Sequence, residues 1–207
     1  MLLIISMLKN KLLIVFTCFI VISCNRNKGN TIKLDNNQST ILFFGDSILG
    51  TKNYFKNLTK EKGYTILKKQ NDLYQKSYLN FENGDISQFN TENINFKFEK
   101  QFLNSEKKFR IVLYTFVDSK KKDSIEFYRN VDDLKYEPSN YTCLSYLDLK
   151  NKKIWQMKYF SSPVDKSVGY ILYKKNKVME NGKIETDSLY YLDESLDVEM
   201  EKYKLYY

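Results

Sequence analysis

Apolar and polar side chains alternate along much of this chain, and this alternation limits the fold more than any other feature. It runs through residues 94–98, 109–117, 155–159, 168–172 and 196–200, where aromatic and β-branched residues are frequent. Successive side chains of a strand point to opposite faces of a sheet, so a period of two is typical of strands. Each of these ranges is therefore predicted to be a strand.

Two Asn-Gly pairs between strand-like segments indicate hairpin turns. Asn83-Gly84 and Asn181-Gly182 each fit the centre of a two-residue type I′ turn, which favours this dipeptide. At the second turn, such a loop would place Met179 opposite Ile184. A third hairpin is predicted to join residues 144–149 to residues 154–160.

Closely spaced strands with short connections are typical of an antiparallel meander. One-sided alternation indicates that one face of the sheet is covered and the other is wet. A sheet of about eight twisted strands must curl or split. We therefore expect a mainly β fold, an antiparallel meander that forms a strongly curved sheet or barrel.

Two segments carry helical signals. Residues 51–62 place three apolar side chains on one helical face and end before Gly63, so a short helix is predicted there. Residues 123–134 begin like a capping box but also alternate as a strand does, and we favour the strand.

The first 24 residues have the pattern of an export signal. A basic segment precedes an apolar run over residues 12–22, which is too short to span a bilayer comfortably. The run ends in Val21-Ile22-Ser23-Cys24, which resembles the lipobox of bacterial lipoproteins. The resemblance implies signal cleavage between Ser23 and Cys24, diacylglycerol on the Cys24 sulfur, and stable membrane anchoring through the acyl chains.

This interpretation divides the chain into three segments. Residues 1–23 are a signal peptide, residues 24–39 form a polar segment expected to be a flexible tether, and residues 40–207 form a single β-rich domain. Asn25 after the cysteine resembles the sorting pattern of outer-membrane lipoproteins. We therefore expect a lipid-anchored protein of the cell envelope, at the outer membrane, whose protein or small-molecule partner the sequence does not identify.

Several chemistries are excluded by composition. The chain has no histidine and no cysteine cluster, so imidazole-based acid–base catalysis and the usual zinc sites are ruled out. We predict no cofactor and no metal ligands. Cys143, the one thiol left after signal cleavage and lipidation, has a strand-like context and is expected to be buried and inert.

Lysines cluster in short groups and make the chain basic. Removal of residues 1–23, which carry two lysines and no acid, lowers the net charge from +8 to +6. The groups, at residues 107–108, 120–122, 152–153 and 174–175, are expected in solvated turns between strands. Attraction to anionic headgroups or to acidic polymers is the alternative, whereas nucleic acid is not an expected partner because no nucleic-acid module is present.

One short segment, ILFFGDSILG at residues 41–50, resembles the nucleophile block of the GDSL (SGNH) hydrolases. The resemblance would make Ser47 a catalytic nucleophile. A serine needs a positioned base, which that family takes from a histidine absent here, and the family's other blocks are also missing. We therefore expect the likeness to be coincidental, the protein not to be an enzyme, and Asp46 or Ser47 to cap the backbone.

The favoured function is a binding or interaction module on a lipid anchor. An inhibitor or immunity-type lipoprotein is the alternative, and an esterase that uses Ser47 is a more distant one. Trp155, the single tryptophan, is the one candidate for a ligand-facing aromatic side chain, because indole is a common anchor in binding sites. Its alternation with Met157 and Tyr159 favours core packing instead.

Overall fold

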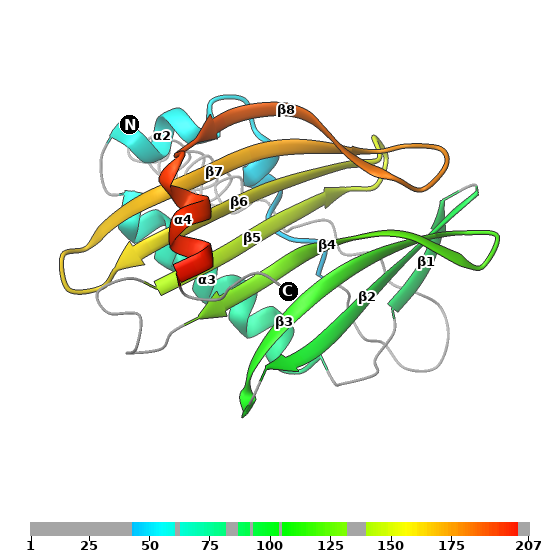
Figure 1. Cartoon of the computed structure of the whole chain (residues 1–207), viewed down its shortest axis with the longest axis horizontal. Coiled ribbons are helices and arrows are strands. Elements are labelled where there is room, and N and C mark those ends of the chain that lie inside the picture. Colours follow the sequence, from blue (N-terminus) through cyan, green and yellow to red (C-terminus); the bar gives the residue numbers. More distant parts are fainter. Residues whose placement is uncertain are drawn as a thin grey trace, which may run out of the picture.

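Eight antiparallel strands form one sheet in which each strand lies beside its neighbour in sequence (Figure 1). This computed structural model describes residues 43–60, 63–81, 87–91, 93–103, 105–131 and 140–202. The strands are β1 (Ser87–Thr91), β2 (Ile94–Leu103), β3 (Ser105–Val117), β4 (Lys120–Val131), β5 (Asn140–Asp148), β6 (Lys153–Ser162), β7 (Ser167–Val178) and β8 (Ile184–Leu192). The mainly β meander predicted from the sequence is confirmed, as are the hairpin of β5 and β6 and the strand in the first part of residues 123–134.

The sheet curls but does not close into a barrel. Strands β4 and β5 pair only over Tyr128–Val131 and Tyr141–Leu144; further along β5, Leu147 instead donates its N–H to the carbonyl of Phe44 at 2.9 Å. Beyond this short pairing the β3–β4 hairpin separates from β5 and contacts the turn between β7 and β8. There Thr115 donates to the Gly182 carbonyl at 2.6 Å, and the Ile184 N–H donates to the Asp123 carboxylate at 2.9 Å.

Helices cover both faces of the sheet. A 3₁₀ turn η1 (Ser47–Gly50), α2 (Tyr54–Lys60) and α3 (Gly63–Leu79) lie on one side, and α4 (Ser195–Lys202) lies on the other (Figure 1). Each side has its own hydrophobic cluster, the larger beneath α2 and α3 and the smaller beneath α4. All residues of both clusters lie between Phe43 and Met200, so this domain contains its described core without the preceding segment.

Tyrosine hydroxyls attach α3 to the sheet. Tyr74 donates to the carbonyl of Ser145 at 2.7 Å and accepts from the Asp46 N–H at 2.8 Å, while Tyr78 donates to the carbonyl of Phe43 at 2.8 Å. Both rings are fully buried. Hydrogen-bonded in this way, a tyrosine adds apolar area to the core without leaving a polar atom unsatisfied.

The prediction for residues 51–62 is correct in kind but not in its limits. Helix α2 covers Tyr54–Lys60, and Gly63 begins α3 instead of ending the preceding helix. A Cβ atom at Gly63 would lie 2.6 Å from the carbonyl oxygen of Leu58. Glycine is therefore needed at the first residue of α3, although a glycine after a basic turn is also typical of a helix end.

Residues 196–200 form a helix, so the strand predicted there is wrong. Leu196 and Met200 are buried and Val198 is exposed, as expected for a helix in which positions i and i+4 share a face. A pattern of only three apolar residues at alternate positions is compatible with a helix as well as with a strand. Asp193, whose carboxylate accepts from the Ser195 N–H at 3.0 Å, favours the helix.

The turn at Asn181-Gly182 differs by one residue from the predicted one. The Gly182 N–H donates to the Met179 carbonyl and the Met179 N–H to the Lys183 carbonyl, so Met179 faces Lys183 and Val178 pairs with Ile184. Among the turn residues 180–182, only Gly182 has a positive φ, 82°. A three-residue turn with a glycine bulge has this pattern, whereas a type I′ turn needs two residues with positive φ. Asn83-Gly84 lies outside the described residues.

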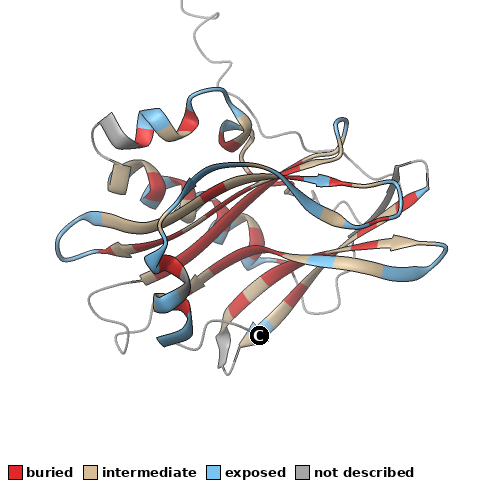
Figure 2. Cartoon of the chain, turned by 45° about the horizontal axis from the view of Figure 1, so that its top comes forward, coloured by how far each residue is buried: buried red, intermediate tan, exposed pale blue. Residues whose placement is uncertain are grey.

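Two expectations about exposure are also wrong. Seven consecutive residues of β5 are buried, so the middle of the sheet is covered on both faces and not on one (Figure 2). Lys107 and Lys108 lie in β3, Lys120, Lys121 and Lys122 begin β4, and Lys174 and Lys175 lie within β7, so these three groups are not in turns. Lys175 is accommodated in β7 by an ion pair with Asp187 of β8.

Candidate functional site

A cleft lined by aromatic rings opens between α2 and the β6–β8 part of the sheet. Its volume is about 400 Å³, within the usual range for small-ligand sites. We name it the aromatic cleft. Its lining residues are Gly50, Thr51, Lys52, Asn53, Tyr54, Phe55, Lys56, Trp155, Tyr173 and Tyr190.

A β-bulge places one of these rings in the cleft. Tyr173 pairs with Tyr191 and Lys174 pairs with Leu189, so Tyr190 is an additional residue on β8. The bulge turns Tyr190 toward the same side as Tyr191, and both rings meet aromatic partners there. Bulges commonly re-aim side chains in this way beside functional sites.

The rings form a compact aromatic cluster. Trp155, Tyr173 and Tyr190 have centroids 5.3 to 5.9 Å apart and planes within 34° of parallel. Phe55 of α2 stacks on Tyr191 at 4.6 Å and 21°. The exposed part of such a cluster offers aromatic area on which a ring-bearing ligand can stack.

Trp155 belongs both to the core and to the cleft. It is half-buried and packs against the larger cluster, and it also lines the cleft. The core packing that the alternation favours is therefore confirmed, and a ligand-facing role for Trp155 stays a prediction. Beside it, Tyr173 is fixed by a short hydrogen bond from its hydroxyl to the Leu49 carbonyl, and burial raises the pKa of this phenol well above its usual value.

Three lysines lie beside these aromatic rings. Among the residues that the structure describes, the cleft lining includes Lys52 and Lys56 but no carboxylate. Lys175 lies 5.8 Å from the Trp155 ring and forms an ion pair with Asp187, which occupies a second bulge of β8. That hydrogen-bonded pairing raises the pKa of Lys175 and lowers the pKa of Asp187. A ligand with an apolar face and a negative group would match this arrangement.

Ser47 does not line the aromatic cleft. It begins η1, and Asp46 caps this turn by accepting from the Ile48 N–H at 3.0 Å, the capping role expected from the sequence. Asp46 also accepts a hydrogen bond from Gln70, at 3.4 Å. Within the described ranges, no hydrogen bond joins Ser47 to a lysine or carboxylate that could serve as its base.

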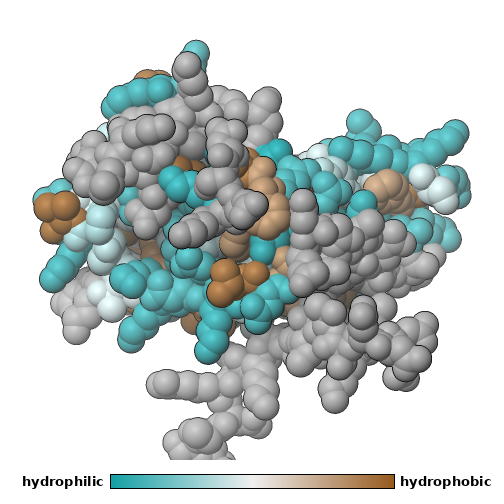
Figure 3. Space-filling model, turned by 90° about the horizontal axis from the view of Figure 1, so that it is seen from below, coloured by the Kyte–Doolittle hydropathy of each residue, from teal (hydrophilic) through white to brown (hydrophobic). Residues whose placement is uncertain are grey.

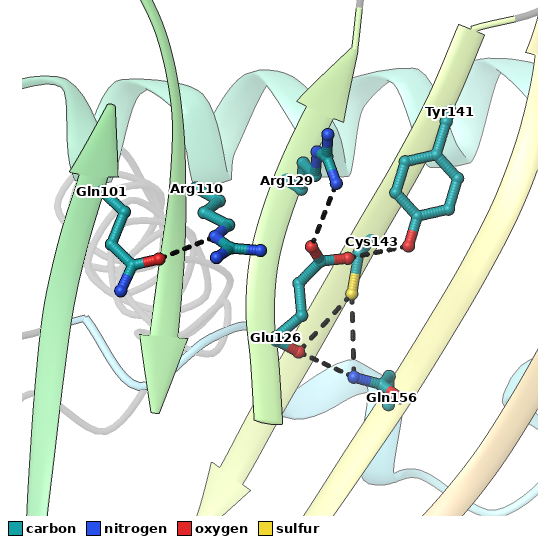
Figure 4. A network of polar contacts seen from close by, with 7 residues as sticks. All are labelled: Gln101, Arg110, Glu126, Arg129, Tyr141, Cys143 and Gln156. Carbon is teal, nitrogen blue, oxygen red and sulfur yellow. Dashed lines mark hydrogen bonds and ion pairs between the residues drawn. The ribbon is translucent and has the colours of Figure 1, made fainter. Parts of the chain in front are cut away.

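A cluster of polar side chains lies buried on the face of the sheet opposite α3 (Figure 4). Glu126 accepts from the Tyr141 hydroxyl at 2.7 Å and lies 3.7 Å from Arg129. The Gln156 amide donates to the Glu126 carbonyl at 2.7 Å and to the Cys143 sulfur at 3.7 Å. These contacts join β4, β5 and β6 where the sheet is most deeply buried, which is a structural task.

Cys143 at the centre of this group is fully buried, as its strand-like context predicted. Burial, reinforced by the nearby Glu126 carboxylate, raises the pKa of the thiol far above its usual value. A neutral, inaccessible thiol is a poor nucleophile.

Ser23 and Cys24, the predicted cleavage and lipidation residues, lie outside the described residues, as does the tether. No described helix has the length and apolar character needed to cross a membrane. Comparison with family models, with curated proteins and with solved structures found no match for this chain.

Only Trp155 among the cleft residues had been singled out from the sequence. Tyr173 and Tyr190 carry no distinguishing local signal, because the chain has 17 tyrosines. Their role depends on a bulge in β8 and on the position of α2, and neither can be read from local periodicity. The exposed aromatic pair Tyr190-Tyr191 near the end of a strand is the one feature that could have drawn attention.

Proposed function

We propose that this chain is a lipid-anchored protein of the cell envelope whose domain binds a ligand in the aromatic cleft. The lipobox at Val21–Cys24 supports the anchor. The half-exposed Tyr190 and the half-buried Trp155, which pack on the buried Tyr173 and are edged by lysines, support the binding role. The ligand has a flat apolar part that stacks on the rings and a negative group that meets the lysines.

The single tryptophan makes this proposal measurable. We choose 8-anilinonaphthalene-1-sulfonate, a planar aromatic anion, as the probe and energy transfer from Trp155 as the signal. The domain from residue 40 onward contains the whole described core, and thermal unfolding would verify that each variant is folded. We expect saturable binding, which Tyr190→Ala weakens about two- to tenfold because one stacked ring is lost.

Phe102→Ala is the matched control, because Phe102 is also a partly exposed ring but lies on β2, away from the cleft. It should leave the dissociation constant unchanged. Equal binding by the unaltered chain and the Tyr190→Ala variant would contradict a site in the cleft.

An inhibitor or immunity-type role is the second candidate, and one observation favours it. Four consecutive apolar residues of the edge strand, Leu189–Leu192, are exposed beside the cleft. Uncharged strand edges of this kind pair with other chains. Recovery of one stoichiometric protein on the immobilised domain, lost with Leu189→Lys, would favour this candidate over a small ligand.

A further inference from the structure

The meander brings lysines from three separate turns to one end of the sheet. The turns that follow β3, β5 and β7 lie together at the right-hand end of Figure 1, because alternate hairpins of a meander turn at the same end. Residues 117–123, 148–153 and 177–185 at this end contain eight lysines and five acids. Hydrophilic side chains dominate the same end in the view from below (Figure 3). We name this surface the lysine end.

Hydrogen bonds hold these turns together. The Val178 N–H donates to the Lys152 carbonyl at 2.8 Å, linking the β5–β6 turn to the last residue of β7. The Thr115 hydroxyl joins β3 to the carbonyl of Gly182 in the β7–β8 turn. The lysines are therefore parts of one surface and not of three independent loops.

Two features concentrate positive charge there. Lys153 and Lys177 occupy directly opposite positions on β6 and β7, an arrangement that is unfavourable between like charges. A hollow of about 420 Å³ between the two turns is lined by two lysines, Lys152 and Lys177, by one carboxylate, Glu180, and by Asn151, Val178, Met179 and Asn181. An anionic group at this end would relieve the repulsion.

The opposite end of the sheet has no comparable excess of lysines. Residues 105–108 at the start of β3, residues 163–166 between β6 and β7 and residues 193–194 after β8 contain three lysines and four acids. Among the described residues the lysine end is therefore the more basic of the two, which would orient the domain in the field of a charged surface.

The described chain begins at the lysine end. Phe44 lies beside Leu147 of β5, and Gly45 lies beside Tyr146, so this segment runs antiparallel to β5. Phe43 is therefore level with the last residues of β5, next to the β5–β6 turn. The segment that leads from Cys24 joins the domain at this point.

We propose that the lysine end docks on anionic lipid headgroups of the membrane that holds the anchor. The proposal rests on the lipid anchor of the proposed function. The 19 residues from Cys24 to Phe43 span at most about 65 Å even when fully extended, so docking is an intramolecular event at high effective concentration. Basic residues near an anionic bilayer are attracted to it, and salt weakens this attraction.

Vesicle sedimentation of the unlipidated domain tests the docking surface. We expect binding to phosphatidylglycerol vesicles, no binding to phosphatidylcholine vesicles, and loss of binding in high salt. The variant Lys120→Glu/Lys150→Glu/Lys183→Glu changes one exposed lysine in each turn and should bind at least tenfold more weakly. The control Lys69→Glu/Lys76→Glu/Lys166→Glu makes the same change of charge on α3 and at the opposite end, and should bind within about twofold of the unaltered domain.

Equal loss in both variants would overturn the proposal, because attraction would then follow net charge and not this surface. Binding to soluble polyphosphate without binding to anionic vesicles would also overturn it, in favour of a soluble polyanion.

Amine labelling of the full lipidated protein in vesicles provides a second readout. Lys120, Lys150 and Lys183 should react several-fold more slowly in phosphatidylglycerol than in phosphatidylcholine vesicles, while Lys69 and Lys76 should not change. Identical labelling in the two lipids would contradict docking even if the anchor is intact. Failure of the protein to associate with either vesicle would instead contradict the anchor.

Discussion

Tyr74 shows how single hydroxyl groups decide where α3 lies on the sheet. Its hydroxyl both donates to the carbonyl of Ser145 and accepts from the Asp46 N–H. It thereby joins α3, β5 and the segment that leads into η1. The sequence contains the residue but no sign of this task, because both partners are backbone atoms from distant parts of the chain.

Tyr74→Phe should lower the free energy of unfolding by about 1–3 kcal/mol, because it leaves a buried carbonyl without its donor while the ring still fills the core. Urea unfolding followed by circular dichroism measures the change. Tyr190→Phe removes a hydroxyl from a half-exposed ring and should change stability by less than about 0.5 kcal/mol. Equal effects of the two substitutions would show that the Tyr74 hydroxyl does not attach the helix.

The buried tyrosines also predict how stability depends on pH. Burial is the main cause that raises the pKa of Tyr74, Tyr78 and Tyr141 well above the usual value. A group with a raised folded-state pKa contributes its full stability below the unfolded pKa, about 10, and loses it as the pH rises above that value. We therefore expect unfolding to become easier above about pH 10. Phenolate absorbance should rise at higher pH in the native domain than in urea, and coincident titration curves would contradict this account.

Periodicity alone assigned most strands correctly but failed where two periods coincide. Alternation over residues 94–98, 109–117 and 155–159 predicted β2, β3 and β6, whereas the same pattern over residues 196–200 belongs to α4. The buried side of α3 consists of Leu67, Gln70, Tyr74 and Tyr78. These positions have helical spacing, but one of them is polar and two of the three apolar ones are tyrosines, which are also frequent in the strands. The sequence pattern therefore does not predict α3.

Substitutions in α4 distinguish the helix from the strand that alternation favoured. Leu196→Ala should lower the free energy of unfolding by about 2–4 kcal/mol, because Leu196 is 1% exposed. Val198→Ala should change it by less than about 0.5 kcal/mol, because Val198 is 64% exposed. A strand would bury both residues on one face and make the two losses similar. Similar losses in urea unfolding would therefore contradict the helix.

At the scale of the whole molecule, the sequence predicted the class of fold but not the site. Turn signals and alternation are local, and they were enough for a curled meander. The aromatic cleft arises where residues more than a hundred positions apart meet, such as Gly50 beside Trp155. The lysine end likewise gathers turns that are separated in the sequence. A bulge in one strand, which local patterns do not specify, completes the cleft.

The proposed lipid anchor is the central claim, because such an anchor would determine where the cleft and the lysine end operate. The most direct test is growth of cells that express the full chain with labelled palmitate, followed by membrane fractionation. We expect the label on a membrane-bound protein, and we expect Cys24→Ser to abolish both the label and the membrane association. An unlabelled protein that remains in the soluble fraction would contradict the account.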